Sequence, residues 1–325
     1  MGAYLPVLIG TAVDRADDLD TAATAGAVVA ALGRLGFRSE CVTVGLDLSQ
    51  LAGLASRRPA AVFNLVESID GDAGLAHLPC PVLDHLGLAY TGAPTAAYIE
   101  SSSKLLTKAR LAAAGIATPA WWLDGREVPA ATTVIVKSVQ EHGSLGLDAG
   151  SVVPGRAAAA EIAARQLRFG GRFFAEAFVA GREFNIALLE SDGRPGVLPI
   201  AEMRFAGFAG DRPRIMDYSA KWDPADPAYR QSGASFGVEG DEPVLAASLT
   251  EIALHCWAAF GLRGYARVDI RLSDSGDPLV LEVNANPCLA PDAGFFLALA
   301  RTGRGYDEMI ADILSAAGPA PEGRC

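Results

Sequence analysis

The chain has 325 residues, half of them hydrophobic, with a net charge of −11 and a pI near 4.9. This length supports a large core and more than one domain. The acidic balance and the lack of a Lys/Arg run argue against nucleic acid or an anionic membrane surface as a partner. No uncharged apolar stretch reaches the ~18 residues that span a bilayer, the N-terminus does not resemble a signal peptide, and the five cysteines are scattered. We therefore expect a reduced, cytoplasmic protein.

The first part of the chain, residues 1–95, alternates buried strands with a helix. The expected elements are a strand at 5–10, a helix at 21–35 closed by Gly36, and strands at 37–44 and 60–66. Such alternation predicts a parallel sheet with helices on its faces.

Residues 96–180 are expected to form a small α+β domain. A helix should begin at SSSK (101–104), with a serine N-cap, and end at Gly115. The elements that follow are strands at 133–137 and 173–179, with a Gly-rich loop at 143–150 and a helix at 155–167 between them.

Residues 181–325 are expected to form the last domain. It should contain further strands from residue 183, a helix at 243–260, two strands, a helix near 305–316 and a frayed tail. The polar segment 209–243 is long for a structureless connection, and such segments often serve as lids.

The most informative stretch is 265–287, YARVDIRLSDSGDPLVLEVNANP, in which two strands flank a turn-rich SDSGDP. We predict a hairpin in which Leu272 pairs with Leu279 across a six-residue turn. Period-two alternation then puts four polar side chains on one face, with Asp269 opposite Glu282 and Arg267 opposite Asn284.

Two carboxylates opposed across strands have Cβ atoms roughly 5 Å apart and repel each other. Mg²⁺ would relieve that repulsion, because it prefers oxygen ligands such as Asp269, Glu282 and Asn284. Arg267 could hold a phosphate or a developing negative charge. The alternative is a solvated hairpin face, and a register slip of one residue would break the arrangement.

Lys137 ends an apolar strand and precedes the Gly/Ser loop, whose backbone N–H groups could fold over phosphates. The alternative for Lys137 is a solvated strand end. The loop itself is a weak signal, because it matches neither GxxxxGK[ST] nor GxGxxG. Glu176 and Glu183 flank AFVAGR, where backbone groups could face a flat heterocycle and Glu183 could accept from sugar hydroxyls. Both could equally be surface acids.

In this order the motifs resemble the ATP-grasp superfamily, and within it the D-alanine–D-alanine ligase-like group. The segments that carry the resemblance are VFNLVESIDGDAG (62–74), residues 90–119, VIVKSVQEHGSLG (134–146), EAFVAGREFNI (176–186), DYSAKW (217–222) and RVDIRL…LEVNANP (267–287). The resemblance implies three domains, with ATP between the central and C-terminal ones.

The resemblance also implies a role for each matching residue. Lys104, Lys137 and Lys221 would contact ATP phosphates. Glu176 and the adjoining Ala177, Phe178 and Val179 would hold the adenine, and Glu183 the ribose. Asp269, Glu282 and Asn284 would bind two Mg²⁺ ions, with Mn²⁺ as an alternative. The residues that would act in catalysis are Arg267, Lys221, Ser144 and, through its backbone N–H, Cys288.

The departures from the family pattern concern the amino-acid site. No acid aligns after the first strand, where Asp17, Asp18 and Asp20 are only nearby; Glu67 stands in place of a histidine, Gly143 of a serine, Trp222 of a tyrosine and Cys288 of a glycine, and a serine is missing near Asp292. Glu67 and Asp292 are therefore candidates for substrate contact. These departures argue against D-alanyl-D-alanine as the product.

We expect an ADP-forming carboxylate–amine ligase acting on small amino-acid-like substrates, and the resemblance suggests a homodimer. The alternatives are an ATP-grasp enzyme of another reaction type, kinase-like or thioester-forming, and a non-catalytic nucleotide-binding regulator. A Rossmann oxidoreductase lacks its glycine fingerprint here.

Several residues have a plainer interpretation. We interpret His77, Cys80 and His85 as packing residues rather than a zinc site, and His142 as a loop contact rather than a base. The side chain of Cys288 fits a small residue at a turn better than a nucleophile, because no histidine lies near it in sequence.

Overall fold

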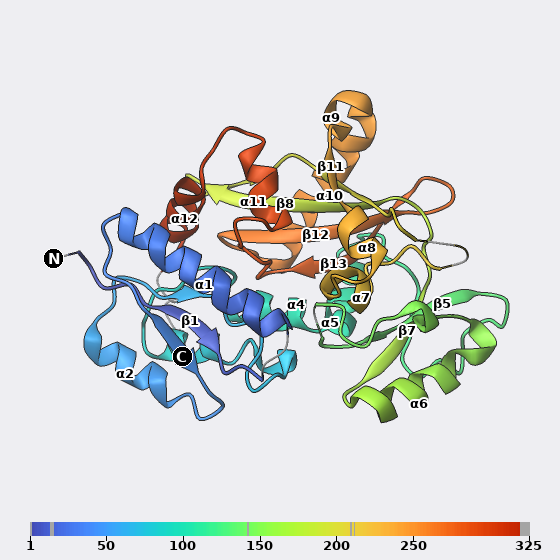
Figure 1. Cartoon of the computed structure of the whole chain (residues 1–325), viewed down its shortest axis with the longest axis horizontal. Coiled ribbons are helices and arrows are strands. Elements are labelled where there is room, and N and C mark those ends of the chain that lie inside the picture. Colours follow the sequence, from blue (N-terminus) through green and yellow to red (C-terminus); the bar gives the residue numbers. More distant parts are fainter. Residues whose placement is uncertain (1, 14–15, 142, 209, 211, 319–325) are drawn as a thin grey trace.

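The computed structural model describes residues 2–13, 16–141, 143–208, 210 and 212–318, without the side chains of 16–18. In this part of the chain three sheets are joined by helices (Figure 1). The strands are β1 (Val7–Gly10), β2 (Cys41–Val44), β3 (Phe63–Asn64), β4 (Trp121–Trp122), β5 (Thr133–Ser138), β6 (Val152–Pro154), β7 (Phe173–Ala177), β8 (Glu183–Ser191), β9 (Arg194–Val197), β10 (Ala201–Arg204), β11 (Gly233–Phe236), β12 (Tyr265–Leu272) and β13 (Pro278–Asn284).

The α-helices are α1 (Ala16–Arg34), α2 (Ser49–Arg57), α3 (Pro79–His85), α4 (Thr95–Ser102), α5 (Lys104–Ala113), α6 (Ala158–Phe169), α7 (Tyr218–Trp222), α8 (Pro227–Gln231), α9 (Val238–Asp241), α10 (Pro243–Phe260), α11 (Gly294–Ala300) and α12 (Tyr306–Ser315). Short 3-10 turns lie at Ala73–Leu75, Ala149–Ser151 and Gly155–Ala157.

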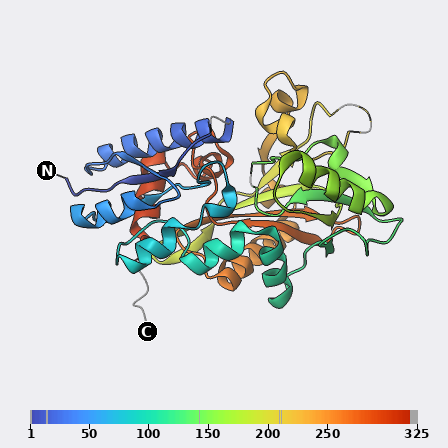
Figure 2. The same cartoon turned by 90° about the horizontal axis from the view of Figure 1, so that it is seen from below.

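The N-terminal sheet is parallel, in the order β2-β1-β3, as the alternation predicts. Adjacent residues of β1 point to opposite faces: Val7 packs with Val28 and other residues of α1, and Leu8 packs with Leu51 and Leu54 of α2. The two helices therefore cover opposite faces of this sheet, as Figure 2 shows. The helix predicted at 21–35 begins five residues earlier, at Ala16.

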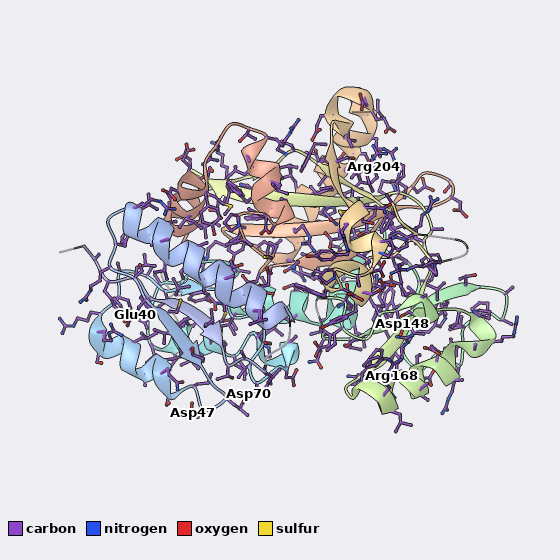
Figure 3. All side chains as sticks on the ribbon, viewed as in Figure 1. Glu40, Asp47, Asp70, Asp148, Arg168 and Arg204 are labelled. Carbon is purple, nitrogen blue, oxygen red and sulfur yellow. The ribbon has the colours of Figure 1, made fainter. Side chains whose placement is uncertain are left out.

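The second sheet is antiparallel, in the order β4-β7-β5-β6, and α6 packs on it. Arg165 of α6 fastens the Gly/Ser loop to the helix, because it donates to the Gly146 carbonyl and pairs with Asp148 at 2.7 Å. Asp148 and Arg168 are labelled at this end of the molecule in Figure 3, far from Glu40 on the N-terminal side.

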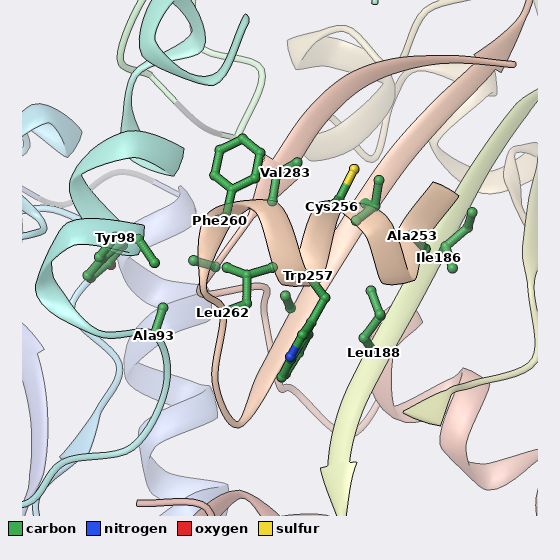
Figure 4. Packing of buried hydrophobic residues seen from close by; sticks show 14 of the residues in the cluster. Ala93, Tyr98, Ile186, Leu188, Ala253, Cys256, Trp257, Phe260, Leu262 and Val283 are labelled. Carbon is green, nitrogen blue, oxygen red and sulfur yellow. The ribbon is translucent and has the colours of Figure 1, made fainter. Parts of the chain in front are cut away.

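The third sheet has six strands, in the order β11-β10-β8-β12-β13, with β9 paired to β8. On one face, α10 packs Cys256 and Trp257 against Ile186 and Leu188 of β8 (Figure 4). The alternate residues of β8 face α11 and α12. In the described chain α10 is the one helix long and apolar enough to cross a membrane by length and composition, but its buried residues belong to this core.

One local prediction was wrong. The helix expected from 101 is split at Ser103 into α4 and α5, and the Ser103 side chain makes no cap hydrogen bond. The segment 209–243, too long for a structureless connection, contains α7, α8, β11 and α9, and α11 was not predicted. Each sheet lies within one of the ranges 1–95, 96–180 and 181–325, although the boundaries themselves stay a prediction.

Candidate active site

The hairpin of β12 and β13 carries the predicted register at its functional end. Asp269 pairs with Glu282 and Arg267 pairs with Asn284. The pairing at the turn was predicted wrongly, because Leu272 lies opposite Pro278 rather than Leu279. A bulge just before Glu282 absorbs Leu281 as an extra residue, so the error at the turn and the unpredicted bulge cancel at the polar positions.

Asp269 is buried and lies at the centre of the polar face. Arg267 binds its carboxylate through two hydrogen bonds, Nε to Oδ1 at 2.7 Å and Nη2 to Oδ2 at 2.9 Å, and Asn185 donates to Oδ1 at 2.9 Å. Burial raises the pKa of Asp269, the Arg267 charge opposes that shift, and Glu282 adds to it. The site therefore brings two repelling carboxylates together, which a divalent cation would compensate.

The donor set fits Mg²⁺, since two carboxylates and the amide of Asn284 share one face. Among the described residues no cluster of three or more His, Cys, Asp and Glu side chains could hold a metal. Softer metals that favour nitrogen or sulfur ligands are poorly matched to this set.

A buried asparagine that sequence reasoning missed fixes the turn after β13. The N–H of Asn286 donates to Asn284 Oδ1 at 2.9 Å, and its Nδ2 donates to the Val66 carbonyl and to Tyr98 Oη, both at 3.2 Å. The turn is thereby joined to the segment after β3. The repeated N in NAN was the available signal.

Two of the predicted nucleotide contacts bind each other. Lys137 Nζ lies 2.6 Å from Glu176 Oε1, and Lys108 Nζ lies 2.5 Å from Glu176 Oε2. Burial opposes ionisation of Glu176, but the two lysines hold its pKa below the ordinary value. Lys104 donates to the Glu141 carbonyl at 2.6 Å. Lys108 was not predicted, although it follows Lys104 by one helical turn.

The backbone beyond β7 is partly committed to other bonds. The N–H of Ala177 donates to Ala120 at 2.8 Å and that of Phe178 to Thr133 at 3.0 Å, while the Val179 carbonyl accepts from another side chain. The adenine contact that we expect from this backbone would therefore use groups other than the N–H of Ala177, the N–H of Phe178 and the carbonyl of Val179.

Arg271 is the side chain that binds Val179, and it too was missed. It donates to the Val179 carbonyl at 2.6 Å and to Glu183 Oε2 at 2.8 Å, and its guanidinium lies 5.9 Å from the centre of the Phe178 ring. It also donates to the carbonyl of Arg214. Alternation along β12 puts residues 267, 269 and 271 on one face, so extending the pattern by one step would have found it.

Gly181 allows this crossing. A Cβ there would lie 2.0 Å from the Leu272 carbonyl oxygen, which no side chain tolerates. The chain between β7 and β8 can therefore approach the end of β12 only with glycine at this position.

The segment 209–243 is fastened to the Gly/Ser loop. Three hydrogen bonds join them: Ser144 Oγ to the Met216 carbonyl (2.6 Å), Trp222 Nε1 to the Gly143 carbonyl (2.8 Å) and the Tyr218 N–H to the Leu147 carbonyl (3.1 Å). We call the segment 209–243 the lid. Ser144, which was predicted to be catalytic, binds this lid through its hydrogen bond to Met216. His142 lies outside the described residues.

The residue Lys221 on α7 has an exposed surface, but other protein groups lie around its side chain. This surrounding and the charge of Arg267 lower the pKa of Lys221, while Glu67, Cys288 and Glu282 oppose the shift. These neighbours come from the first and the last of the three parts of the chain. Lys221 is thus near the polar face of the hairpin.

Glu67 borders two small cavities. One is lined by Ile9, Gly10, Ala12, Thr21, Ala22, Glu67 and Ser68, and the other by Glu67, Ala76, Tyr98, Ser101, Ser102, Asn284, Ala285 and Asn286. Glu67 therefore lies between the end of β1 and the turn after β13. Asp292 is exposed and lines neither cavity.

Cys288 lies next to this region. Its Sγ donates to Asp20 Oδ2 at 3.2 Å, and burial, reinforced by Glu67, raises the pKa of the thiol to about 12. A thiol so protonated is a poor nucleophile. The side chains of Asp17 and Asp18 lie outside the described residues. Cys80 is buried and accepts from Asn64, while His85 is exposed.

Three features define the ATP-grasp class. They are a four-stranded sheet with a Gly/Ser loop, a six-stranded sheet with paired acids, and a lid between them that carries a lysine. A family model described as the D-ala D-ala ligase C-terminus matches residues 125–315. The chain is 32% identical to the D-alanine–D-alanine ligase of Moorella thermoacetica, over 82% of this chain and 86% of that one, and 33% identical to that of Caulobacter sp., over 82% and 80%. The chain belongs to the D-alanine–D-alanine ligase-like family.

A solved structure agrees with this fold. The D-alanine–D-alanine ligase of Bacillus anthracis, complexed with ATP, superposes with a TM-score of 0.73 at 18% identity and covers 97% of each chain. The predicted ATP-grasp fold is confirmed.

Proposed function

We propose that this protein is an ADP-forming carboxylate–amine ligase that uses Mg-ATP to join two small amino-acid-like molecules. The observation that carries the proposal is the single face on which Asp269, Glu282, Asn284 and Arg267 lie, beside Lys221 of the lid. The names of the relatives, D-alanine–D-alanine ligases, support the reaction type.

In this proposal Asp269, Glu282 and Asn284 hold two Mg²⁺ ions. Bound Mg²⁺ would neutralise charge on the phosphates during transfer. The remaining roles are phosphate binding by Lys104, Lys137 and Lys221, adenine binding beside Glu176, Ala177, Phe178 and Val179, and ribose binding by Glu183.

Glu183 and Glu176 both pair with cations in this structure. Ribose binding by Glu183 would use its second carboxylate oxygen, because Arg271 binds Oε2. Nucleotide binding would separate Lys137 from Glu176, so that the lysine reaches a phosphate. Both steps are rearrangements of side chains rather than of strands.

The reaction proceeds in two steps. A substrate carboxylate oxygen attacks the γ-phosphorus and ADP leaves, which gives an acyl phosphate. An amine then attacks the acyl carbon, phosphate leaves and the amine loses a proton. Arg267 and Lys221 stabilise the transferred phosphoryl group, and the backbone N–H of Cys288 stabilises the tetrahedral intermediate.

The lid protects the acyl phosphate. Its hydrogen bonds to the Gly/Ser loop close the cleft over the reacting groups and exclude water, which would hydrolyse the intermediate.

The substrates are proposed to differ from two D-alanines. Glu67 occupies the position of the family histidine and borders both cavities at the substrate end of the cleft, so it would contact the substrate there. Asp292 is a weaker candidate because it is exposed. We further propose a cytoplasmic homodimer with no nucleic-acid or membrane partner.

The test is a screen of amino-acid pairs for phosphate release with ATP and Mg²⁺. Release should require a second substrate, and Asp269→Asn should abolish it. Asp274→Asn, in the exposed turn of the same hairpin, is the matched control and should leave release unchanged. Activity that survives Asp269→Asn would show that the metal assignment is wrong.

The same screen tests the second candidate, an ATP-grasp enzyme of another reaction type, which the changed residue at Glu67 favours. That enzyme would release ADP with one substrate and no amine acceptor.

A further inference from the structure

Lys108 is a charged residue without access to solvent. Its side chain is fully buried, and its Nζ lies 2.5 Å from Glu176 Oε2, 2.7 Å from Thr118 Oγ1 and 3.5 Å from the Leu281 carbonyl. Buried lysines are rare and persist only where partners compensate the charge. The partners of Lys108 belong to β7, to the segment after α5 and to β13, so one ammonium group joins the two sheets that face the nucleotide site.

The bulge in β13 supplies one of these partners. Leu281 is the residue without a partner in the ladder to β12, and it directly precedes Glu282. The neighbouring Val280 exchanges bonds with the segment after α5, since its N–H donates to Ala117 and its carbonyl accepts from Thr118. Lys108 is therefore anchored beside Glu282, a proposed metal ligand. Figure 1 shows α5, the helix that carries Lys108, near β13 in the centre of the molecule.

Glu176 lies between two lysines of unlike exposure. Lys137 is 14% exposed at its side chain, whereas Lys108 is not exposed at all. Two ammonium groups and one carboxylate leave one positive charge in excess, on the side of Lys137. A buried carboxylate that lost its only cation would be strongly destabilised. Because Glu176 has two cations, one of them can leave.

We propose that Lys108 is the permanent counter-ion of Glu176, and that it thereby allows Lys137 to move from Glu176 to a nucleotide phosphate. Lys108 is a positioning residue, because it acts through Glu176 and Lys137 and contacts no ligand itself. The inference rests on the proposed function, which makes those two residues nucleotide contacts.

The test compares equilibrium binding of Mg-ADP and of a non-hydrolysable Mg-ATP analogue by calorimetry. Lys108→Met should weaken binding about tenfold, because Lys137 is then retained as the only cation of Glu176. Arg110→Met, which removes an exposed cation from the same helix, should leave affinity unchanged. In the Glu176→Gln background there is no charge to compensate, so Lys108→Met should change affinity by about twofold at most.

Equal losses in the two backgrounds, or a lowered Tm with unchanged affinity, would overturn the inference and leave Lys108 a purely structural residue. If Lys108→Met does not fold, the comparison of Glu176→Gln with the double variant decides alone, and a large further loss there overturns it. A wild-type protein that binds neither nucleotide rejects the proposed function instead.

Discussion

At the scale of single residues, the lid lysine combines a lowered pKa with a place beside Arg267. A lowered pKa means that the charged form is lost at a lower pH than for a free lysine. The proposed phosphate binding by Lys221 should therefore weaken as the pH approaches this lowered pKa, which lies below the ordinary value of 10.5.

We therefore expect kcat/KM for ATP, which reports ionisations of the free enzyme, to fall along an alkaline limb that begins below pH 10.5. Lys221→Met should lower kcat/KM about 100-fold and remove that limb. Lys221→Arg keeps the charge and should move the limb beyond the measurable range. An unchanged limb in Lys221→Met would assign the ionisation to another group.

Residues whose chemistry follows from strand alternation could be predicted, and those that act through burial could not. Arg267 and Asp269 alternate on one strand as Glu282 and Asn284 do on the next, and the two pairs oppose each other across a recognisable turn. Lys108 carries no such signal, because a lysine on a helix is ordinarily solvated and only the fold shows that its end is buried. Cys288 could be placed at the turn, but its bond to Asp20 depends on a contact across 268 residues.

At the scale of elements, the lid and the Gly/Ser loop form one unit. Trp222 donates its indole N–H to the Gly143 carbonyl, and the tyrosine of the family pattern has no such N–H. A bond of this kind contributes about 1 kcal/mol. It should bias the lid towards the closed state.

Trp222→Phe keeps the ring and removes only the donor. We expect KM for ATP to rise about fivefold, the factor that about 1 kcal/mol gives, and the ratio of ATP hydrolysed to product formed to increase because water enters more often. Coupled ADP release and product quantification measure both. Trp257→Phe, in the core on α10, should lower Tm and leave the ratio unchanged; an equal ratio in both variants would contradict a role for the bond.

Long periodic elements were predictable and irregular ones were not. The helix at 243–260 has the predicted bounds because its eighteen residues begin with a proline and contain no glycine. The break at Ser103 and the bulge at Leu281 have no local signal, since both serve contacts with distant segments. The short helices α7 and α8 lie in a segment whose polarity indicated a loop.

At the scale of the whole molecule, the three sheets do not share their cores equally. Two hydrophobic clusters each combine residues before 95 with residues after 181. The third holds the small sheet and α6 alone, through Val128, Val134, Val136, Ala158, Ile162, Phe173 and Ala175. The sequence indicated three α/β units in order, but not that the first and last share cores, because periodicity identifies buried faces and not their partners.

Hydrogen exchange should reveal this unequal sharing. Without nucleotide, amides of β5 and β7 should exchange faster than those of β1 and β8, because the small core opens without disturbing the two shared ones. Mg-ATP bound between the two sheets at a concentration of 100 times Kd adds about 2.7 kcal/mol, so exchange in β5 and β7 should slow about 100-fold.

The control is Asp269→Asn, in which Mg-ATP should give little of this slowing because the metal proposed to bind β12 and β13 would link the nucleotide to the large sheet. Exchange of β1 in step with β5, rather than with β8, would contradict the shared core. Slowing confined to the small sheet and equal in Asp269→Asn would mean that the nucleotide binds that sheet alone. Under the proposed arrangement, closure needs both sheets, since Lys137 lies on β5 of the small sheet and the metal ligands lie on β12 and β13 of the large one.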